Sequence, residues 1–152
     1  ISEIKTLYEW SENSYGVDAK KDDIITEDNQ KKVIRMAKEL AVKTKAVIVI
    51  TGETDLVTDG ETVYFIKNGV PEMARITGCG CMLDGVIAGF IGANQGNILE
   101  ATVTAVSAMG ICGEYARENA KGTGTLKVHL IDAMSNIDET WMERSNQIES
   151  RS

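Results

Sequence analysis

Ile76-Thr77-Gly78-Cys79-Gly80-Cys81 runs directly into MLDGVIAGF at residues 82–90, and this segment decides how the chain is interpreted. Two glycines on either side of one small residue let the backbone come close to a ligand. The stretch after them predicts a helix, and the first N–H groups of a helix have no partner within it and attract anions. The segment therefore predicts a phosphate-holding turn, although a tight turn that only packs its helix closely has the same pattern.

Cys81 closes this turn at the start of the predicted helix. The helix dipole favours a negative side chain at that place, so the thiol is suited to take a proton from a hydroxyl group. Small buried cysteines also occupy such positions for structural reasons alone, and the residues by themselves leave that alternative open. We interpret Cys81 as the candidate catalytic residue.

The segments before the turn change from a helical to a strand pattern. Residues 27–43 place apolar side chains at helical spacing, which predicts an amphipathic helix. Residues 46–50 (AVIVI) form a continuous aliphatic run, typical of a strand covered on both faces in a parallel sheet. Residues 55–58 and 62–66, joined through Asp59-Gly60, predict a hairpin. Together they predict an α/β fold with a mostly parallel sheet, a hairpin and covering helices.

Helices dominate the prediction after the turn. One is expected at about 80–92, and another at about 98–118, where small and apolar residues lie on most sides and Asn97 with Glu100 forms a cap. Gly122-Thr123-Gly124 is predicted to be a loop before a last amphipathic helix at about 127–137. The polar stretch 138–152 carries no pattern that assigns it.

Composition excludes several classes of protein. The formal net charge is −7, and no basic run interleaved with aromatic residues occurs, which argues against nucleic-acid binding. A polyanion would therefore depend on backbone dipoles, a metal ion and nearby cations such as Lys67 or Arg75. We find no apolar run of membrane-spanning length and no signal-peptide pattern, so we expect a cytoplasmic protein. The three cysteines are expected to be reduced thiols.

Residues 49–55 (VITGETD), the hairpin after them and the segment ITGCGCMLDGVIAGF together resemble the hydroxyethylthiazole kinase family of the ribokinase-like superfamily. Most of that superfamily carries aspartate where Cys81 stands, whereas thiazole kinases characteristically carry cysteine. The resemblance extends from about Ser2-Glu3-Ile4 to Gly122-Thr123-Gly124. Cys79 departs from the pattern, because the family usually has alanine there.

The resemblance implies a ribokinase-like layered fold and the transfer of a phosphoryl group from ATP, with Mg²⁺, to 4-methyl-5-(2-hydroxyethyl)thiazole in thiamine salvage. It implies that Cys81 acts as the base, that Thr51 contacts ATP, and that Gly78 contacts the thiazole alcohol. The N–H groups of Gly78, Cys79, Gly80 and Cys81 are expected to hold the phosphates of ATP. For Thr51, a role that only caps the strand or turn is the alternative.

The resemblance also implies a homotrimer with its sites between subunits and magnesium ligands that lie mainly outside this chain, so we assign no metal ligand. Family members have roughly as much chain again before Ser2-Glu3-Ile4. We therefore expect residues 1–152 to be the C-terminal part of a single kinase domain, and we expect the isolated chain to be inactive.

The sequence leaves two alternatives to a thiazole kinase. One is a hydroxymethylpyrimidine kinase of the same superfamily, whose turn normally reads Gly-Thr-Gly-Cys; an NAD(P)H-hydrate dehydratase of this fold would carry aspartate at position 81. The other is a non-catalytic nucleotide-binding fragment or assembly partner.

Overall fold

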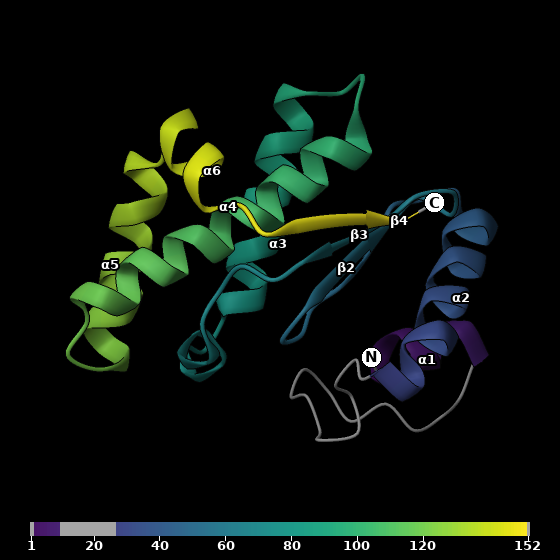
Figure 1. Cartoon of the computed structure of the whole chain (residues 1–152), viewed down its shortest axis with the longest axis horizontal. Helices are drawn as coiled ribbons and strands as arrows, with labels where there is room; N and C mark the ends of the chain where they lie inside the picture. Colours follow the sequence, from purple (N-terminus) through teal and green to yellow (C-terminus); the bar gives the residue numbers. More distant parts are fainter. Residues whose placement is uncertain (1, 10–26, 152) are drawn as a thin grey trace. The chain divides into compact units, whose positions relative to one another are not determined.

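The computed structural model describes residues 2–9 and 27–151, which fall into two compact units. Unit 1 comprises Ile1–Phe65 with Ser150–Ser152, and unit 2 comprises Ile66–Glu149. Helices and strands are both present, so the predicted α/β class is confirmed (Figure 1).

In unit 1 a helix covers short strands. Helix α1 (Ser2–Glu9) contacts helix α2 (Glu27–Thr44), and α2 also contacts strands β1 (Ile48–Ile50) and β2 (Asp55–Thr58) (Figure 1). The helix expected at 27–43 is confirmed, since its apolar stripe supplies one side of the unit's core. That core is made of side chains that water scarcely reaches: Val33, Ala37, Ile50, Leu56, Val63 and Phe65.

The strand order of the sheet is β1-β2-β3-β4, with β3 at Val63–Ile66 and β4 at Ile148–Arg151. β1 and β2 pair antiparallel, with Val49 opposite Val57. The parallel arrangement expected for the strand at 46–50 is therefore wrong. Val49 is half-buried and only Ile50 of this strand is fully buried. The aliphatic run thus indicated a strand, but neither its burial on both faces nor which strand lies alongside.

The predicted hairpin is confirmed as β2 and β3. Its turn is held by Asp59, whose Oδ1 accepts hydrogen bonds from the N–H groups of Glu61 and Thr62, both at 2.9 Å. Gly60 has a φ of 102°, which favours glycine at this place. The Asp-Gly dipeptide thus forms the turn for which its two residue types are suited.

Unit 2 is built around α4 (Ile98–Asn119), which contacts α3 (Cys79–Ala93), α5 (Thr123–Asn136) and α6 (Glu139–Ser145) (Figure 1). Every residue from Ala101 to Gly113 except Thr104 is buried, so the prediction of a helix covered on most sides is confirmed. Asn97 is the N-cap residue, but its side chain makes no capping hydrogen bond. The capping interaction expected with Glu100 is therefore not formed.

The loop expected at Gly122-Thr123-Gly124 is shorter than predicted, because α5 already begins at Thr123. The hydroxyl oxygen of Thr125 accepts hydrogen bonds from the N–H groups of Lys121 and Gly122, at 2.9 and 3.1 Å. This interaction starts the helix despite the two glycines. The unassigned stretch after residue 137 forms α6, capped by Asp138, and β4.

Candidate active site

The glycine turn lies where the sequence places it, immediately before α3. A short 3₁₀ helix, η2 (Pro71–Arg75), leads into it, and Gly78 is the N-cap residue of α3. Gly78 has a φ of 84°, a left-handed conformation that L side chains rarely adopt. No side chain caps α3. The turn therefore depends on glycine at 78, and the start of the helix is open.

The N–H groups of the turn divide into two kinds. That of Cys79 donates to the carbonyl oxygen of Ile76 at 3.1 Å, so it is already used within the chain. Those of Gly80 and Cys81 lie in the first helical turn, where no intrahelical acceptor exists. A β-carbon built on Gly78 or Gly80 would meet no atom within 4 Å. The N–H groups of Gly80 and Cys81 are thus left without an intrahelical acceptor, as those that bind a phosphate oxygen at a helix start are.

The three cysteines differ in access. Cys81 is exposed on the first turn of α3, Cys79 is half-buried and Cys112 is buried in α4. Burial raises the pKa of Cys79, and it raises the pKa of Cys112 to about 11. Cys81 is therefore the most accessible thiol, and it lies at the positive end of a helix dipole.

Thr51 lies in unit 1, directly after β1, and is exposed. The next residue, Gly52, donates its N–H to Oδ1 of Asp55 at 2.8 Å. Burial raises the pKa of Asp55 to about 6, while the hydrogen bond from Gly52 lowers it. The sequence analysis assigned Asp55 no role, and this bond was missed. The signal was present, since aspartate at such turns commonly accepts from a nearby backbone N–H.

Comparison with known proteins identifies the family. The model of the hydroxyethylthiazole kinase family matches residues 1–140. The chain belongs to the hydroxyethylthiazole kinase family. Hydroxyethylthiazole kinase 1 of Clostridium botulinum (strain Loch Maree / Type A3) is 41% identical over 150 residues, which cover 99% of this chain. Hydroxyethylthiazole kinase of Clostridium acetobutylicum is 40% identical over 153 residues, again 99% of this chain. The chain spans 56% of the length of each of these two relatives.

The solved structures agree with this assignment. The hydroxyethylthiazole kinase protein from Pyrococcus horikoshii OT3 is similar, with a TM-score of 0.76 and 27% sequence identity, over 83% of this chain and 49% of that chain. The expected ribokinase-like fold is thereby confirmed.

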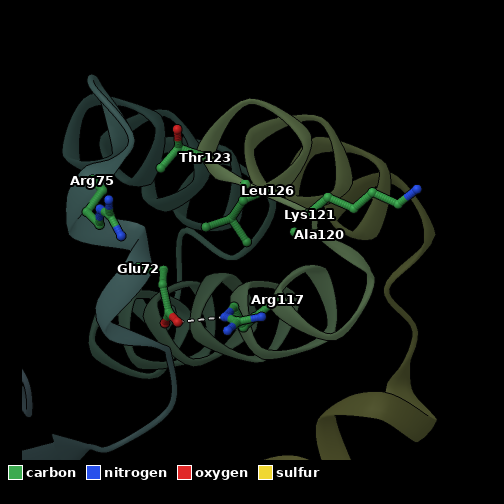
Figure 2. Close-up of a pocket in the computed structure, with 8 residues that line it drawn as sticks. Glu72, Arg75, Arg117, Ala120, Lys121, Thr123 and Leu126 are labelled. Atoms are coloured by element: carbon green, nitrogen blue, oxygen red, sulfur yellow. Dashed lines mark hydrogen bonds and ion pairs between the residues drawn. The ribbon is translucent and has the colours of Figure 1, made fainter.

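The two cations considered for ATP have different surroundings. The ammonium group of Lys67 forms an ion pair with the carboxylate of Glu149. Arg75 ends η2, three residues before Gly78, and lines a pocket of about 210 Å³ in unit 2 (Figure 2). Of the two, Arg75 is thus the one placed beside a cavity.

That pocket lies between η2, the end of α4 and the start of α5. Arg117 donates from Nε to Glu72 across it at 2.6 Å, and this bond holds the pKa of the Glu72 carboxyl below its usual value (Figure 2). The lining has three basic side chains, Arg75, Arg117 and Lys121, and one acidic side chain, Glu72. The net charge of the pocket lining is therefore positive, although the chain as a whole is acidic. Its other residues are Ala120, Gly122, Thr123 and Leu126.

The described residues contain no group of three or more histidine, cysteine, aspartate or glutamate side chains that could hold a metal ion. These residues therefore supply no assignable magnesium site. Within the same part of the chain, no helix has both the length and the apolar character needed to cross a membrane.

Proposed function

We propose that the enzyme containing this chain phosphorylates the primary alcohol of 4-methyl-5-(2-hydroxyethyl)thiazole with ATP, in thiamine salvage. The observation that carries the proposal is the open, uncapped start of α3 with the exposed Cys81 on its first turn. The family to which the chain belongs supports the choice of reaction and substrate.

Each residue of the turn has a role in this proposal. The N–H groups of Gly80 and Cys81 donate to the phosphoryl oxygens, whose charge must be stabilised in the transition state. Cys81 accepts the proton of the substrate hydroxyl group and holds that group in line. Gly78 leaves room for the alcohol and the phosphates, and Cys79 fills the position between the two glycines. The proposed contact of Thr51 with ATP rests on the family resemblance.

The remaining features of the proposal rest on the family resemblance. They are Mg²⁺ as the ion that accompanies ATP, a homotrimeric assembly and a cytoplasmic location. The negative formal charge of the chain gives weight to a metal ion and to Arg75 as partners of ATP. The expectation that residues 1–152 alone are inactive stays a prediction, and an assay of this chain with Mg·ATP and the thiazole alcohol tests it.

Substitution of Cys81 tests the mechanism in an active enzyme that contains these residues. Cys81→Ser is expected to lower kcat by at least ~10-fold, the lower side of general-base effects. Cys81→Asp is expected to retain activity, because a carboxylate takes the same proton. Cys112→Ala is the matched control, since it removes a thiol that is buried in α4. Parent-like kinetics for both Cys81 variants would contradict the catalytic role.

The same assay separates the two kinases. Hydroxyethylthiazole and hydroxymethylpyrimidine are supplied as competing alcohols, and the ratio of their kcat/KM values is measured. We expect the ratio to favour the thiazole.

A further inference from the structure

A half-buried carboxylate in unit 1 is not used by the proposed mechanism. Asp55 is the first residue of β2, and β1 ends at Ile50, which pairs with Leu56. Four residues, Thr51 to Thr54, make the connection between the two strands. Asp55 therefore stands at one end of a short loop whose other end carries Thr51.

Asp55 reaches back across this loop to the residue that follows Thr51. Its Oδ1 accepts the Gly52 N–H at 2.8 Å, and the donor belongs to the peptide group that joins Thr51 to Gly52. Because a peptide group is planar, fixing its N–H also fixes the direction of the Thr51 carbonyl and restricts the ψ angle of Thr51. The bond thus acts on the backbone conformation of Thr51.

The loop and the first residue of β2 carry two carboxylates whose exposure to water differs. Glu53 lies in the same loop and is exposed, whereas Asp55 is half-buried, and its partial loss of water raises its pKa to about 6. Burying a carboxylate is unfavourable unless hydrogen bonds compensate for the lost water. A charge-assisted bond to a backbone N–H is among the stronger ones available to a loop.

We propose that Asp55 is a positioning residue that holds the Thr51-Gly52 backbone in the conformation that binds the nucleotide. The proposal rests on the assignment of Thr51 to ATP under the proposed function. Asp55 does not touch the nucleotide itself. Its removal therefore changes the affinity for ATP and leaves the affinity for the thiazole alcohol unchanged.

The test uses four variants of an active enzyme that contains these residues, with KM for ATP, KM for the thiazole alcohol and calorimetric binding of ATP as readouts. Asp55→Ala is expected to raise KM and Kd for ATP about 10-fold, the effect of one lost hydrogen bond to a charged group. Asp55→Asn keeps the accepting oxygen and is expected to stay within about 3-fold of the parent. Thr51→Ala reports whether Thr51 binds ATP at all.

Asp59→Ala is the matched control. Asp59 also accepts backbone N–H bonds in a turn of unit 1, but at the other end of β2, between Thr58 and Val63. It is expected to lower stability without changing KM for ATP. Should Asp55→Ala fail to fold, Asp55→Glu carries the test, because it keeps the charge but moves the carboxylate by one methylene group.

The outcomes distinguish this inference from the proposed function. Suppose that Thr51→Ala weakens ATP binding but Asp55→Ala binds ATP like the parent. This result overturns the inference about Asp55 and leaves the proposed function standing. An equal loss in Asp55→Ala and Asp59→Ala also overturns it, because the effect is then one of general stability. If Thr51→Ala binds ATP normally, the assignment of Thr51 fails and the inference falls with it.

Discussion

The side chain of Asn68 accepts a hydrogen bond from the backbone N–H of Gln147 at 2.8 Å, although 79 positions separate the two residues. Its Oδ1 also accepts from the hydroxyl of Ser107, and its Nδ2 donates to the carbonyl of Ser145 and to the carboxylate of Glu114. Asn68 is only 6% exposed. One buried amide thus connects the segment before η2, helix α4 and the chain after α6.

Asn68→Ala is expected to lower the free energy of unfolding by about 3 kcal/mol, since several buried groups lose their partner at once. Urea denaturation measures the change. Asn136→Ala is the control, because Asn136 donates to the carbonyl of Asp132 on an exposed surface. It is expected to change the unfolding free energy by less than about 0.5 kcal/mol. Equal effects of the two substitutions would mean that the buried network contributes nothing of its own.

Gly110 is the position in α4 where an added methyl group meets the backbone of another segment. A β-carbon there would lie 2.7 Å from the carbonyl carbon and oxygen of Asn68. Gly110→Ala is therefore expected to destabilise by at least about 2 kcal/mol, as overpacking does. Gly89→Ala in α3, where nothing lies within 4 Å, is expected to stabilise by about 0.5 kcal/mol. Thermal unfolding of both variants decides, and a stable Gly110→Ala protein would contradict the close approach.

Gly80→Val tests the proposed phosphate-binding role of the glycine turn separately from folding. The new side chain projects from the first turn of α3 into open space, so the protein is expected to keep its parent circular dichroism spectrum. It would occupy the volume proposed for phosphate, and ATP binding in an active enzyme is expected to weaken at least about 10-fold. Gly92→Val, near the other end of α3 and equally open, serves as control. Unchanged nucleotide affinity in Gly80→Val would remove the turn from the site.

The thiols are expected to react in order of access. With iodoacetamide at about pH 8, Cys81 is alkylated first, Cys79 more slowly and Cys112 only after denaturation. The raised pKa values of Cys79 and Cys112 reduce their thiolate fractions at that pH and act in the same direction as burial. Peptide mass spectrometry over time measures the order. Early labelling of Cys112 in the native protein would contradict the burial of α4.

Asp55 gives stability a pH dependence whose sign is opposite to that of an ordinary paired carboxylate. Its pKa is 3.8 in the unfolded reference and about 6 in the folded chain, so between these values the native state binds more protons. Its contribution to stability therefore falls as pH rises through this window. Compared with the parent, Asp55→Asn is expected to gain stability between about pH 4 and pH 7 in urea titrations. Parallel pH profiles of parent and variant would show that Asp55 is not desolvated.

The features that sequence predicted were those encoded by neighbouring residues. The periodicity at 27–43, the small-residue helix at 98–118 and the glycines at 78 and 80 each specify local conformation. The pairing direction of β1 was missed because the aliphatic run AVIVI favours a strand but does not specify its partner. The role of Asn68 was also invisible, since its partners lie 39 to 79 positions away. Asn68 is followed by Gly69, and an Asn-Gly dipeptide is equally compatible with an exposed turn and with a buried asparagine that connects distant segments.

The start of α5 was also predicted wrongly, although the residues that determine it are close in sequence. Two glycines within three residues favour a loop, yet the hydroxyl of Thr125 satisfies two N–H groups and lets the helix begin at Thr123. Asp55 was assigned no role from the sequence, although its side chain accepts the N–H of Gly52. In both cases one side-chain hydrogen bond to the backbone outweighed the average preference of the residues involved.

The chain enters and leaves unit 2 at neighbouring points. The N–H of Lys67 donates to the carbonyl of Gln147 at 3.0 Å, and the side chain of Lys67 pairs with Glu149, while the unit runs from Ile66 to Glu149. A segment whose two ends meet in this way is suited to circular permutation, because a short linker can join the ends. New termini can then be opened within unit 2, for example between α3 and α4. Such a variant interrupts the chain between the glycine turn and α4 without cutting a strand of the sheet.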